Sequence, residues 1–477
     1  MKKAVLIVVS IITLLFINFN VSAKDTVYSL NKFEEEKFNF ILDSYNEKKE
    51  KDGVVVGGDI FKGTANDIGD FSPLKTILVK YNYNGKVLWY FTYDENLTST
   101  LNYLEYTYDD TGNIDGYLLV VSKSDSDKEL SLGSSKKTTF VKVDLTGKFE
   151  WEKETLAQED IVITKIISFM QEDAKYYIAI GTSTSDNKAV MIKYDRDLNP
   201  LWSKKYDHEG ITSSEYIDII PTIENKNVVG FALIRKLIKE DSNQIELVKH
   251  NLDGAEEFII NYDLNKKTSY NLVKNNAGIV LYGITPEVKL KKGNFSYYIV
   301  KFNLTGEEEW ETIGEEALNT DKKIKLFPVE DNNEIIKYLF MYTSNSDTIN
   351  TEVAEIDLDG LFVKKIKKIA SDYYVVSDFS FNNNTLYFAG QINCPEDDNC
   401  EYDSRSLFLI SDEDKVIEVE DNTSERILIA TIVFIIIIGI GVFIGKKRKL
   451  KNLWGDIYEE RKNIYRNNSP FCIYWII

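Results

Sequence analysis

The chain has 477 residues, and its 76 acidic residues outnumber 57 basic ones, which gives a net charge of −19. A protein this acidic repels phosphate backbones and anionic headgroups, so we expect no nucleic-acid partner. Three cysteines are too few for a disulfide-rich scaffold, and two histidines leave little material for histidine-based catalytic or metal sites.

Residues 1–23 have the pattern of a secretory signal peptide. Lys2 and Lys3 precede a mostly apolar run, Ala4–Ile17, and the small residues of Val21-Ser22-Ala23 provide a cleavage site. The run is shorter than the roughly 20 residues that span a bilayer, which disfavours an uncleaved anchor. We therefore expect export and a mature chain that begins at Lys24.

One ten-residue frame recurs through residues 24–422, which we expect to form an extracellular domain. Successive copies start 51 to 62 residues apart. The copies are Lys80–Trp89, Lys142–Trp151, Lys193–Trp202, Lys249–Phe258, Lys301–Trp310 and the weaker Glu355–Lys364 and Leu409–Glu418. A near-constant period of this length is typical of stacked structural repeats.

Most copies predict a β-hairpin, because an alternating strand meets Asn-Gly, Asp-Gly or Thr-Gly, where glycine can adopt the positive φ of a tight turn. The turn position is occupied by Gly85, Gly147, Gly254, Gly306 and Gly360. The outgoing strand carries an aromatic residue at Trp89, Trp151, Trp202, Phe258 or Trp310. We expect these aromatic side chains to pack against the neighbouring unit, and we predict a structural role for both sets.

A second pair of apolar strands precedes each hairpin, as in Ile167–Gly181 and Val376–Gly390. Each unit therefore holds four strands. Seven such units in series, almost without helical periodicity, predict an all-β, seven-bladed β-propeller. The last two copies lack the aromatic residue and the seventh also lacks the glycine, so six or eight blades stay open.

The repeated K-[YF]-[DN]-x-x-G-x-x-x-W signature resembles that of secreted bacterial β-propellers similar to the quinoprotein-like (PQQ-like) superfamily, over about residues 30–422. Five of seven copies keep the turn glycine and four keep tryptophan. The resemblance implies the propeller fold. The quinoprotein pattern implies an aspartate four residues before the glycine, whereas Asp144 stands three before Gly147, so we expect no quinone cofactor.

The connections between the second and third strands of the units are long in four places: 59–75, 122–137, 234–244 and 393–405. In a four-stranded blade these connections emerge on one face of the disc, and long insertions on one face are typical of a binding surface. The last of them contains Cys394 and Cys400, which form either a disulfide or two free thiols. It also contains Glu396, Asp397 and Asp398, which are either a weak Ca²⁺ candidate or simply solvated.

The sequence predicts no catalytic residues and no cofactor. His208 and His250 are the two histidines, and neither has a partner at a recognisable catalytic or metal-binding spacing. No glycine-rich phosphate loop is present.

Residues 427–445 contain no charge, and their length nearly matches a bilayer core about 30 Å thick, which predicts a transmembrane helix. Lys446, Lys447, Arg448 and Lys449 follow at once, and this basic start predicts that 446–477 is a short cytoplasmic tail. We expect a single-pass type I protein at the cell membrane with its propeller outside.

These observations predict a cell-surface, membrane-anchored binding or scaffold module that recognises an extracellular protein or glycan through its long connections. The alternative is a propeller enzyme, either a quinone-dependent dehydrogenase or a carboxylate-based hydrolase.

Overall fold

The computed structural model describes most of the predicted propeller. The described residues are 26–28, 35–61, 75–93, 98–124, 137–155, 160–240, 242–260, 262–286, 295–314, 324–331, 334–345, 349–370, 374–393 and 404–412. The predicted signal peptide 1–23, transmembrane span 427–445 and tail 446–477 lie outside these ranges. Within the ranges, no helix is long and apolar enough to cross a bilayer.

The strands form seven antiparallel four-stranded sheets, or blades, which confirms the predicted all-β, seven-bladed β-propeller. Blade 1 holds β2 (Glu35–Tyr45), β3 (Lys51–Phe61), β4 (Lys75–Asn82) and β5 (Val87–Thr92). Blade 2 holds β6 (Thr98–Tyr108), β7 (Ile114–Ser124), β8 (Lys137–Asp144) and β9 (Phe149–Glu154). Blade 3 holds β10 (Ile161–Gln171), β11 (Ala174–Ser183), β12 (Lys188–Asp195) and β13 (Pro200–Lys205).

The remaining blades repeat this order. Blade 4 holds β14 (Ser213–Glu224), β15 (Asn227–Ile238), β16 (Asn243–Asn251) and β17 (Glu256–Ile260), and the short 3₁₀ helix η1 (Leu264–Lys266) follows it. Blade 5 holds β18 (Ser269–Val273), β19 (Ile279–Thr285), β20 (Ser296–Phe302) and β21 (Glu308–Ile313). Blade 6 holds β22 (Lys325–Asp331), β23 (Glu334–Asn345), β24 (Ile349–Ile356) and β25 (Phe362–Ala370). Blade 7 holds β26 (Tyr374–Asn382), β27 (Thr385–Asn393), β28 (Ser404–Asp412) and β1 (Thr26–Tyr28).

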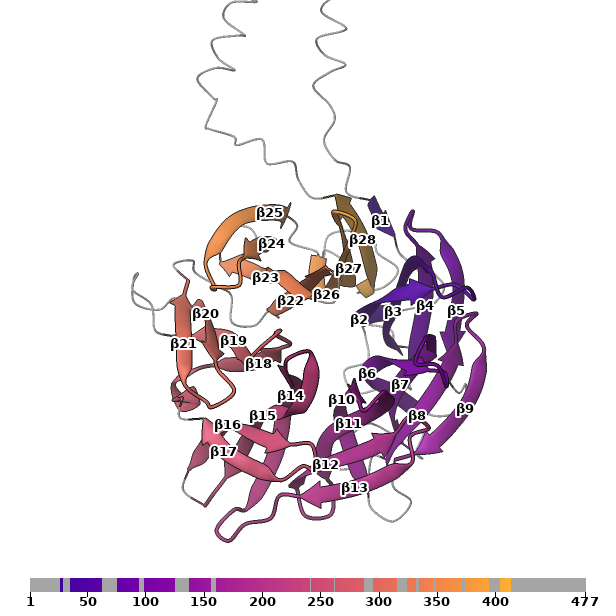
Figure 1. Cartoon of the computed structure of the whole chain (residues 1–477). Helices are drawn as coiled ribbons and strands as arrows, with labels where there is room; N and C mark the ends of the chain where they lie inside the picture. Colours follow the sequence, from indigo (N-terminus) through magenta and orange to yellow (C-terminus); the bar gives the residue numbers. More distant parts are fainter. Residues whose placement is uncertain are drawn as a thin grey trace, which may run out of the picture. The chain divides into compact units, whose positions relative to one another are not determined.

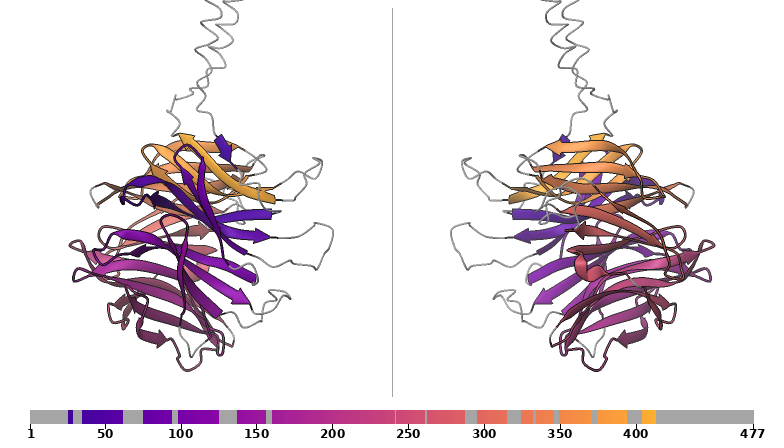
Figure 2. Two further views of the ribbon diagram at one scale, coloured as in Figure 1. Left: turned by 90° about the vertical axis from the view of Figure 1, so that its right-hand side faces the viewer. Right: turned by 90° about the vertical axis from the view of Figure 1, so that its left-hand side faces the viewer.

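The blades are arranged in sequence order around a central axis, with the first strand of each blade nearest that axis (Figure 1). Figure 2 shows the same ring from its edges. Burial depends on the position of a strand within its blade. All residues between the two ends of β4, a third strand, are buried, whereas the outermost strand β13 is mostly exposed. The second and third strands, such as β11 and β12, are therefore buried over most of their length, because neighbouring blades cover both of their faces.

The core consists of seven hydrophobic clusters, one at each seam between neighbouring blades. At the seam between blades 1 and 2, for example, Val55 and Leu78 of blade 1 pack with Leu104 and Leu119 of blade 2. No blade has a core of its own, so the stability of each blade depends on both of its neighbours.

The ring is closed by the N-terminal strand, which the sequence did not predict. The seventh copy, Leu409–Glu418, was expected to form its own hairpin. Instead β1 takes the outer position of blade 7, where Thr26 pairs with Ile410 and Tyr28 pairs with Phe408. The second half of that copy lies outside the described residues.

The predicted seventh copy is also displaced by one residue. Lys80, which opens the first copy, pairs with Val55, and Val55 packs toward the following blade. Leu409 pairs with Phe388, and both pack toward the preceding blade. Because successive strand residues point to opposite faces, a repeat frame that is shifted by one residue assigns each of its side chains to the wrong face of the blade.

One of the four predicted long connections is wrong. Residues 234–238 complete β15, and β16 begins at Asn243, so only four residues separate the two strands. The charged residues of this segment favoured a loop, whereas Arg235 and Glu246 are buried within the blade as an ion pair.

The repeated aromatic residues lie against the turn glycines of the following blade. Gly147 has a φ of +86°, and a Cβ there would come within 2.5 Å of Trp89, so the position requires glycine for two independent reasons. The same arrangement pairs Trp202 with Gly254, Phe258 with Gly306 and Trp310 with Gly360. At the closing seam, Tyr28 of β1 occupies this place against Gly85.

Candidate functional site

The lysine that opens each strong copy has a structural role that the sequence reasoning missed. Lys142 on β8 is nearly buried, and its Nζ lies 2.6 Å from Asp115 Oδ2 and 2.9 Å from Glu150 Oε2. Burial alone would lower the pKa of Lys142, but hydrogen bonds to these two carboxylates outweigh it and raise the pKa above its ordinary value. The signal was visible in the sequence, because an acidic residue precedes the aromatic one at Glu150, Glu257 and Glu309.

Related contacts recur in other blades. Lys80 Nζ is 2.9 Å from Asp52 Oδ2, and Lys301 Nζ is 2.7 Å from Glu309 Oε2. Lys249 forms an ion pair with Glu257. These lysines hold the third strand of a blade to the strands beside it, so their presence alone does not mark a ligand site.

The seam between blades 2 and 3 departs from the pattern. The turn of blade 3 carries Leu198 where the other strong copies carry glycine, and Leu198 has a φ of 57°. The left-handed region costs a branched residue about 1–2 kcal/mol. The Leu198 side chain is 2% exposed and packs in the same cluster as Trp151, the docking aromatic residue of blade 2. A buried leucine side chain thus packs with the docking aromatic residue at this seam, whereas at the other seams that have such a residue it lies directly on a glycine.

A cleft of about 470 Å³, which we call the blade 2–3 cleft, lies beside this contact. Its walls come from residues 107–111 at the turn between β6 and β7, from Asp115 and Lys142, from Trp151, and from Arg196 and Asp197 on the turn between β12 and β13. The volume falls within the range of small-molecule sites, about 300–1,000 Å³.

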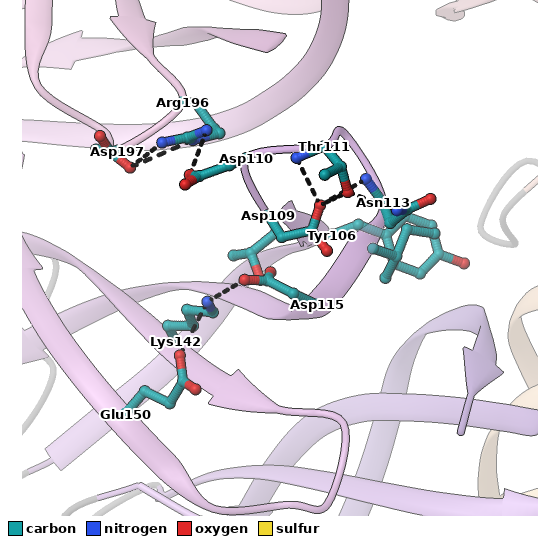
Figure 3. Close-up of polar contacts among 12 residues, drawn as sticks. Tyr106, Asp109, Asp110, Thr111, Asn113, Asp115, Lys142, Glu150, Arg196 and Asp197 are labelled. Carbon is teal, nitrogen blue, oxygen red and sulfur yellow. Dashed lines mark hydrogen bonds and ion pairs between the residues drawn. The ribbon is translucent and has the colours of Figure 1, made fainter. Parts of the chain in front are cut away.

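Charged groups from both blades meet across the cleft (Figure 3). Arg196 Nη1 lies 2.7 Å from Asp110 Oδ1 of the neighbouring blade, and its Nη2 lies 3.4 Å from Asp197 Oδ1. On the blade 2 side, Lys142 lies between Asp115 and Glu150. The lining therefore contains four aspartates and two cations, and its net charge is −2.

Asp109 is held rigidly at one wall of the cleft. Its Oδ1 accepts hydrogen bonds from the backbone N–H groups of Thr111 and Asn113 and from the Thr111 hydroxyl, at 3.0, 3.0 and 2.6 Å. The hydrogen bond from the Thr111 side chain is the main reason that the pKa of Asp109 is lowered from its ordinary value. The carboxylate is therefore ionised at neutral pH.

A second set of polar groups lies on the first strands near the axis. Lys165 of β10 donates to Asp218 Oδ1 of β14 at 2.5 Å, and the other oxygen of Asp218 accepts the Leu272 N–H of the next blade at 2.7 Å. Lys325 and Asp378 make an equivalent pair between blades 6 and 7. Each aspartate joins neighbouring blades through a backbone N–H, which indicates a structural role.

Two carboxyl groups near the axis have strongly raised pKa values. Burial raises the pKa of Asp59 to about 7, although the Leu101 N–H donates to it. Burial also raises the pKa of Glu105 to about 7, against hydrogen bonding from the Tyr106 N–H. Perturbed acids are common in active sites and in structural networks alike.

The two histidines, for which the sequence predicts no catalytic or metal-binding role, occupy different environments. His250 is 4% exposed, and its Nδ1 lies 3.3 Å from the Gly254 carbonyl oxygen. Burial lowers its pKa, so the ring is neutral. His208 packs against Tyr206 with ring centroids 4.4 Å apart. Among the described residues, no group of three or more His, Cys, Asp or Glu side chains is placed to hold a metal ion.

The predicted calcium candidate Glu396, Asp397 and Asp398 and the cysteines Cys394 and Cys400 lie outside the described residues. The residues of the blade 2–3 cleft were not predicted as a site. The available signal was the loss of glycine from the third copy, KYDRDLNPLW, in an otherwise regular series.

The topology places the chain in the class of seven-bladed β-propellers. No family model matches the sequence, so the resemblance to the PQQ-like superfamily stays a prediction. No curated protein matches it either.

Solved structures with similar folds include the Dos1 propeller, with 10% identity, coverage of 81% of this chain and 94% of that chain, and a TM-score of 0.44. The polysaccharide lyase Uly1 has 9% identity, coverage of 81% and 99%, and a TM-score of 0.47. A putative 6-phosphogluconolactonase from Bacteroides fragilis has 12% identity, coverage of 76% and 92%, and a TM-score of 0.38. Similarity at this level says nothing about ligand or activity.

Proposed function

We propose that the protein is a membrane-anchored, cell-surface binding or scaffold module that captures an extracellular protein or glycan through one face of the ring, without chemistry of its own. This face, which we call the long-connection face, is where the second strand of each blade ends and the third begins.

The uneven length of the connections carries the proposal. On the long-connection face, 13 residues separate β3 from β4, 12 separate β7 from β8, and 10 separate both β19 from β20 and β27 from β28. On the opposite face, the turns between first and second strands have at most five residues. Long connections on a rigid framework are where binding residues concentrate, because they vary without disturbing the core.

The position at which the chain leaves the ring supports the same surface. β28 is the third strand of its blade and begins at the long-connection face, so Asp412 at its end lies on the opposite face. The last described residue before the predicted anchor at 427–445 therefore lies on the face opposite the proposed binding face.

The enzyme alternative has no specific support among the described residues. The raised acids Asp59 and Glu105 lie near the axis, but Asp59 is engaged with the backbone of the next blade. The two histidines lie far apart in sequence, and among the described residues neither forms a hydrogen bond or ion pair with a carboxylate.

Site-specific photo-crosslinking on intact cells tests the proposal. A photo-reactive residue at the exposed positions Ser185 or Glu240, in connections between second and third strands, reports on the long-connection face, and one at the exposed turn residue Asp173 reports on the opposite face as a matched control. We expect one defined glycan or protein adduct from the first two positions and none from Asp173. Adducts from Asp173 alone would contradict the proposed face, and a stoichiometric chromophore or metal on the purified protein would favour the enzyme.

A further inference from the structure

The blade 2–3 cleft is independent of the long-connection face, because the turns that form it, around Asp109 and Leu198, lie on the opposite face of the ring. We propose that this cleft is a saccharide-binding site for one or two neutral sugar residues of a glycan.

The shape of the cleft favours a small ligand over a protein surface. A cleft of about 470 Å³ can enclose a small molecule, whereas stable protein interfaces bury about 800 Å² on each partner. Its lining combines two aromatic side chains, Tyr108 and Trp151, with charged and hydroxyl groups. Aromatic faces pack against the C–H surfaces of sugar rings, and fixed polar groups bond to the ring hydroxyls.

The polar groups of the cleft are held in place before a ligand arrives. Asp109 is held by three hydrogen bonds to its Oδ1, and Lys142 is held between Asp115 and Glu150. Arg196 contacts Oδ1 of Asp110 and of Asp197, and Oδ2 of these two exposed aspartates has no partner among the described residues, which leaves acceptors for hydroxyl groups. Groups fixed in advance lose little conformational entropy on binding, so neutral hydrogen bonds can yield useful affinity.

The charges of the cleft favour a neutral sugar over charged ligands. The lining has a net charge of −2, which disfavours uronic and sialic acids. A ligand with a lysine or arginine side chain would be repelled by Lys142 and Arg196. The nearby carboxylates Asp115 and Asp110 are already paired with these two cations. Neutral hydroxyl groups can bond to both kinds of group without separating the ion pairs.

The cleft lies at the seam whose turn has Leu198 in place of glycine. Where glycine is present, as at Gly254 and Gly360, the docking tryptophan lies directly on the turn. Leu198 keeps a left-handed backbone that disfavours leucine and inserts a buried side chain between the blades. A strained residue of this kind persists only where the surrounding structure holds it in place.

Binding of the full-length protein to neutral oligosaccharides tests the inference. The probes are gluco-, galacto- and manno-oligosaccharides and N-acetylglucosamine oligomers, with oligogalacturonate and a pentalysine peptide in parallel, and the readout is saturation-transfer NMR with tryptophan fluorescence. Asp197→Ala should weaken binding about tenfold or more, the loss expected when a hydrogen bond to a charged group worth about 1.5–3 kcal/mol is removed. Asp253→Ala is the matched control, because Asp253 precedes Gly254 at the corresponding turn of the next blade.

Leu198→Gly provides a second variant, which should bring the turn onto Trp151 and abolish saccharide binding while circular dichroism stays unchanged. Binding of a neutral probe that is lost in Asp197→Ala and kept in Asp253→Ala supports the inference. Binding of pentalysine or oligogalacturonate alone, equal loss in both aspartate variants, or no saccharide binding at about 10 mM overturns it. The photo-crosslinks of the opposite face are unaffected by these variants, so the two proposals fail separately.

Discussion

Asp59→Asn should stabilise the ring above neutral pH. Asp59 is 4% exposed, its Oδ1 accepts the Leu101 N–H at 2.8 Å, and its Oδ2 lies 3.4 Å from Asn39 Nδ2. Asparagine keeps a carbonyl oxygen for Leu101, and Asn39 can rotate its amide to accept a hydrogen bond from the new NH₂. The substitution therefore removes a buried charge while keeping both contacts.

The magnitude follows from the pKa. Burial raises the pKa of Asp59 from 3.8 to about 7, which corresponds to a penalty of up to about 4 kcal/mol at about 1.4 kcal/mol per pKa unit. The folded state binds the extra proton, so the native protein loses stability from this group as pH rises from about 4 to about 7. Below about pH 4 the carboxyl group is protonated in both states, and the penalty vanishes.

Thermal unfolding of the full chain in detergent at pH 4.5 and pH 8 measures the effect. For a cooperative unit of this size, about 1 kcal/mol corresponds to roughly 1 °C, so we expect Asp59→Asn to raise the midpoint by several degrees at pH 8 and little at pH 4.5. Asp218→Asn is the matched control: Asp218 also accepts a backbone N–H of the next blade, but its substitution leaves Lys165 without its ion-pair partner. The control should lower stability by about 3 kcal/mol. An equal loss of stability in Asp59→Asn at both pH values would refute the reasoning.

Three further predictions concern the docking, closure and topology of the chain. Gly360→Ala should destabilise the ring by about 2–4 kcal/mol, because the new Cβ would lie 2.2 Å from Trp310. The control Gly112→Ala, with a similar φ and open space around it, should cost only the backbone strain of about 1–2 kcal/mol. The thermal unfolding midpoints of the two variants measure the difference. Tyr28→Ala should weaken the seam between blades 7 and 1, because it removes the hydrogen bond to the Asn84 carbonyl oxygen and the packing on Gly85. Amide hydrogen exchange should then accelerate first in β28. Uniform acceleration over all blades would argue against closure of the ring by β1. In a Cys394→Ser/Cys400→Ser variant, where Cys472 is the remaining cysteine, a membrane-impermeant maleimide should label the protein only after cells are permeabilised, and labelling on intact cells would reverse the predicted orientation.

The strands and turns were predictable because they depend on local features of the chain. The alternation around Lys142, the turn glycine Gly147 and the recurrence of both at a near-constant period sufficed to predict four-stranded units and to favour seven of them, with six or eight left open. The segment 234–244 was misassigned because its charged residues obscured the alternation of two paired strands, in which Arg235 is buried through ion pairs with Glu246 and Glu256.

The sequence by itself determined a repeated, all-β chain whose aromatic residues and glycines suit contacts between units. Only the tertiary structure decided which segments meet across the ring: β1 pairs with β28 although Thr26 and Ile410 are 384 residues apart, and Arg196 reaches Asp110 of another blade. Local patterns specify backbone conformation, whereas contacts between blades depend on strand register and on the reach of single side chains. For that reason the blade 2–3 cleft, whose lining comes from two blades, depends on the tertiary structure, and neither of the two copies alone defines it.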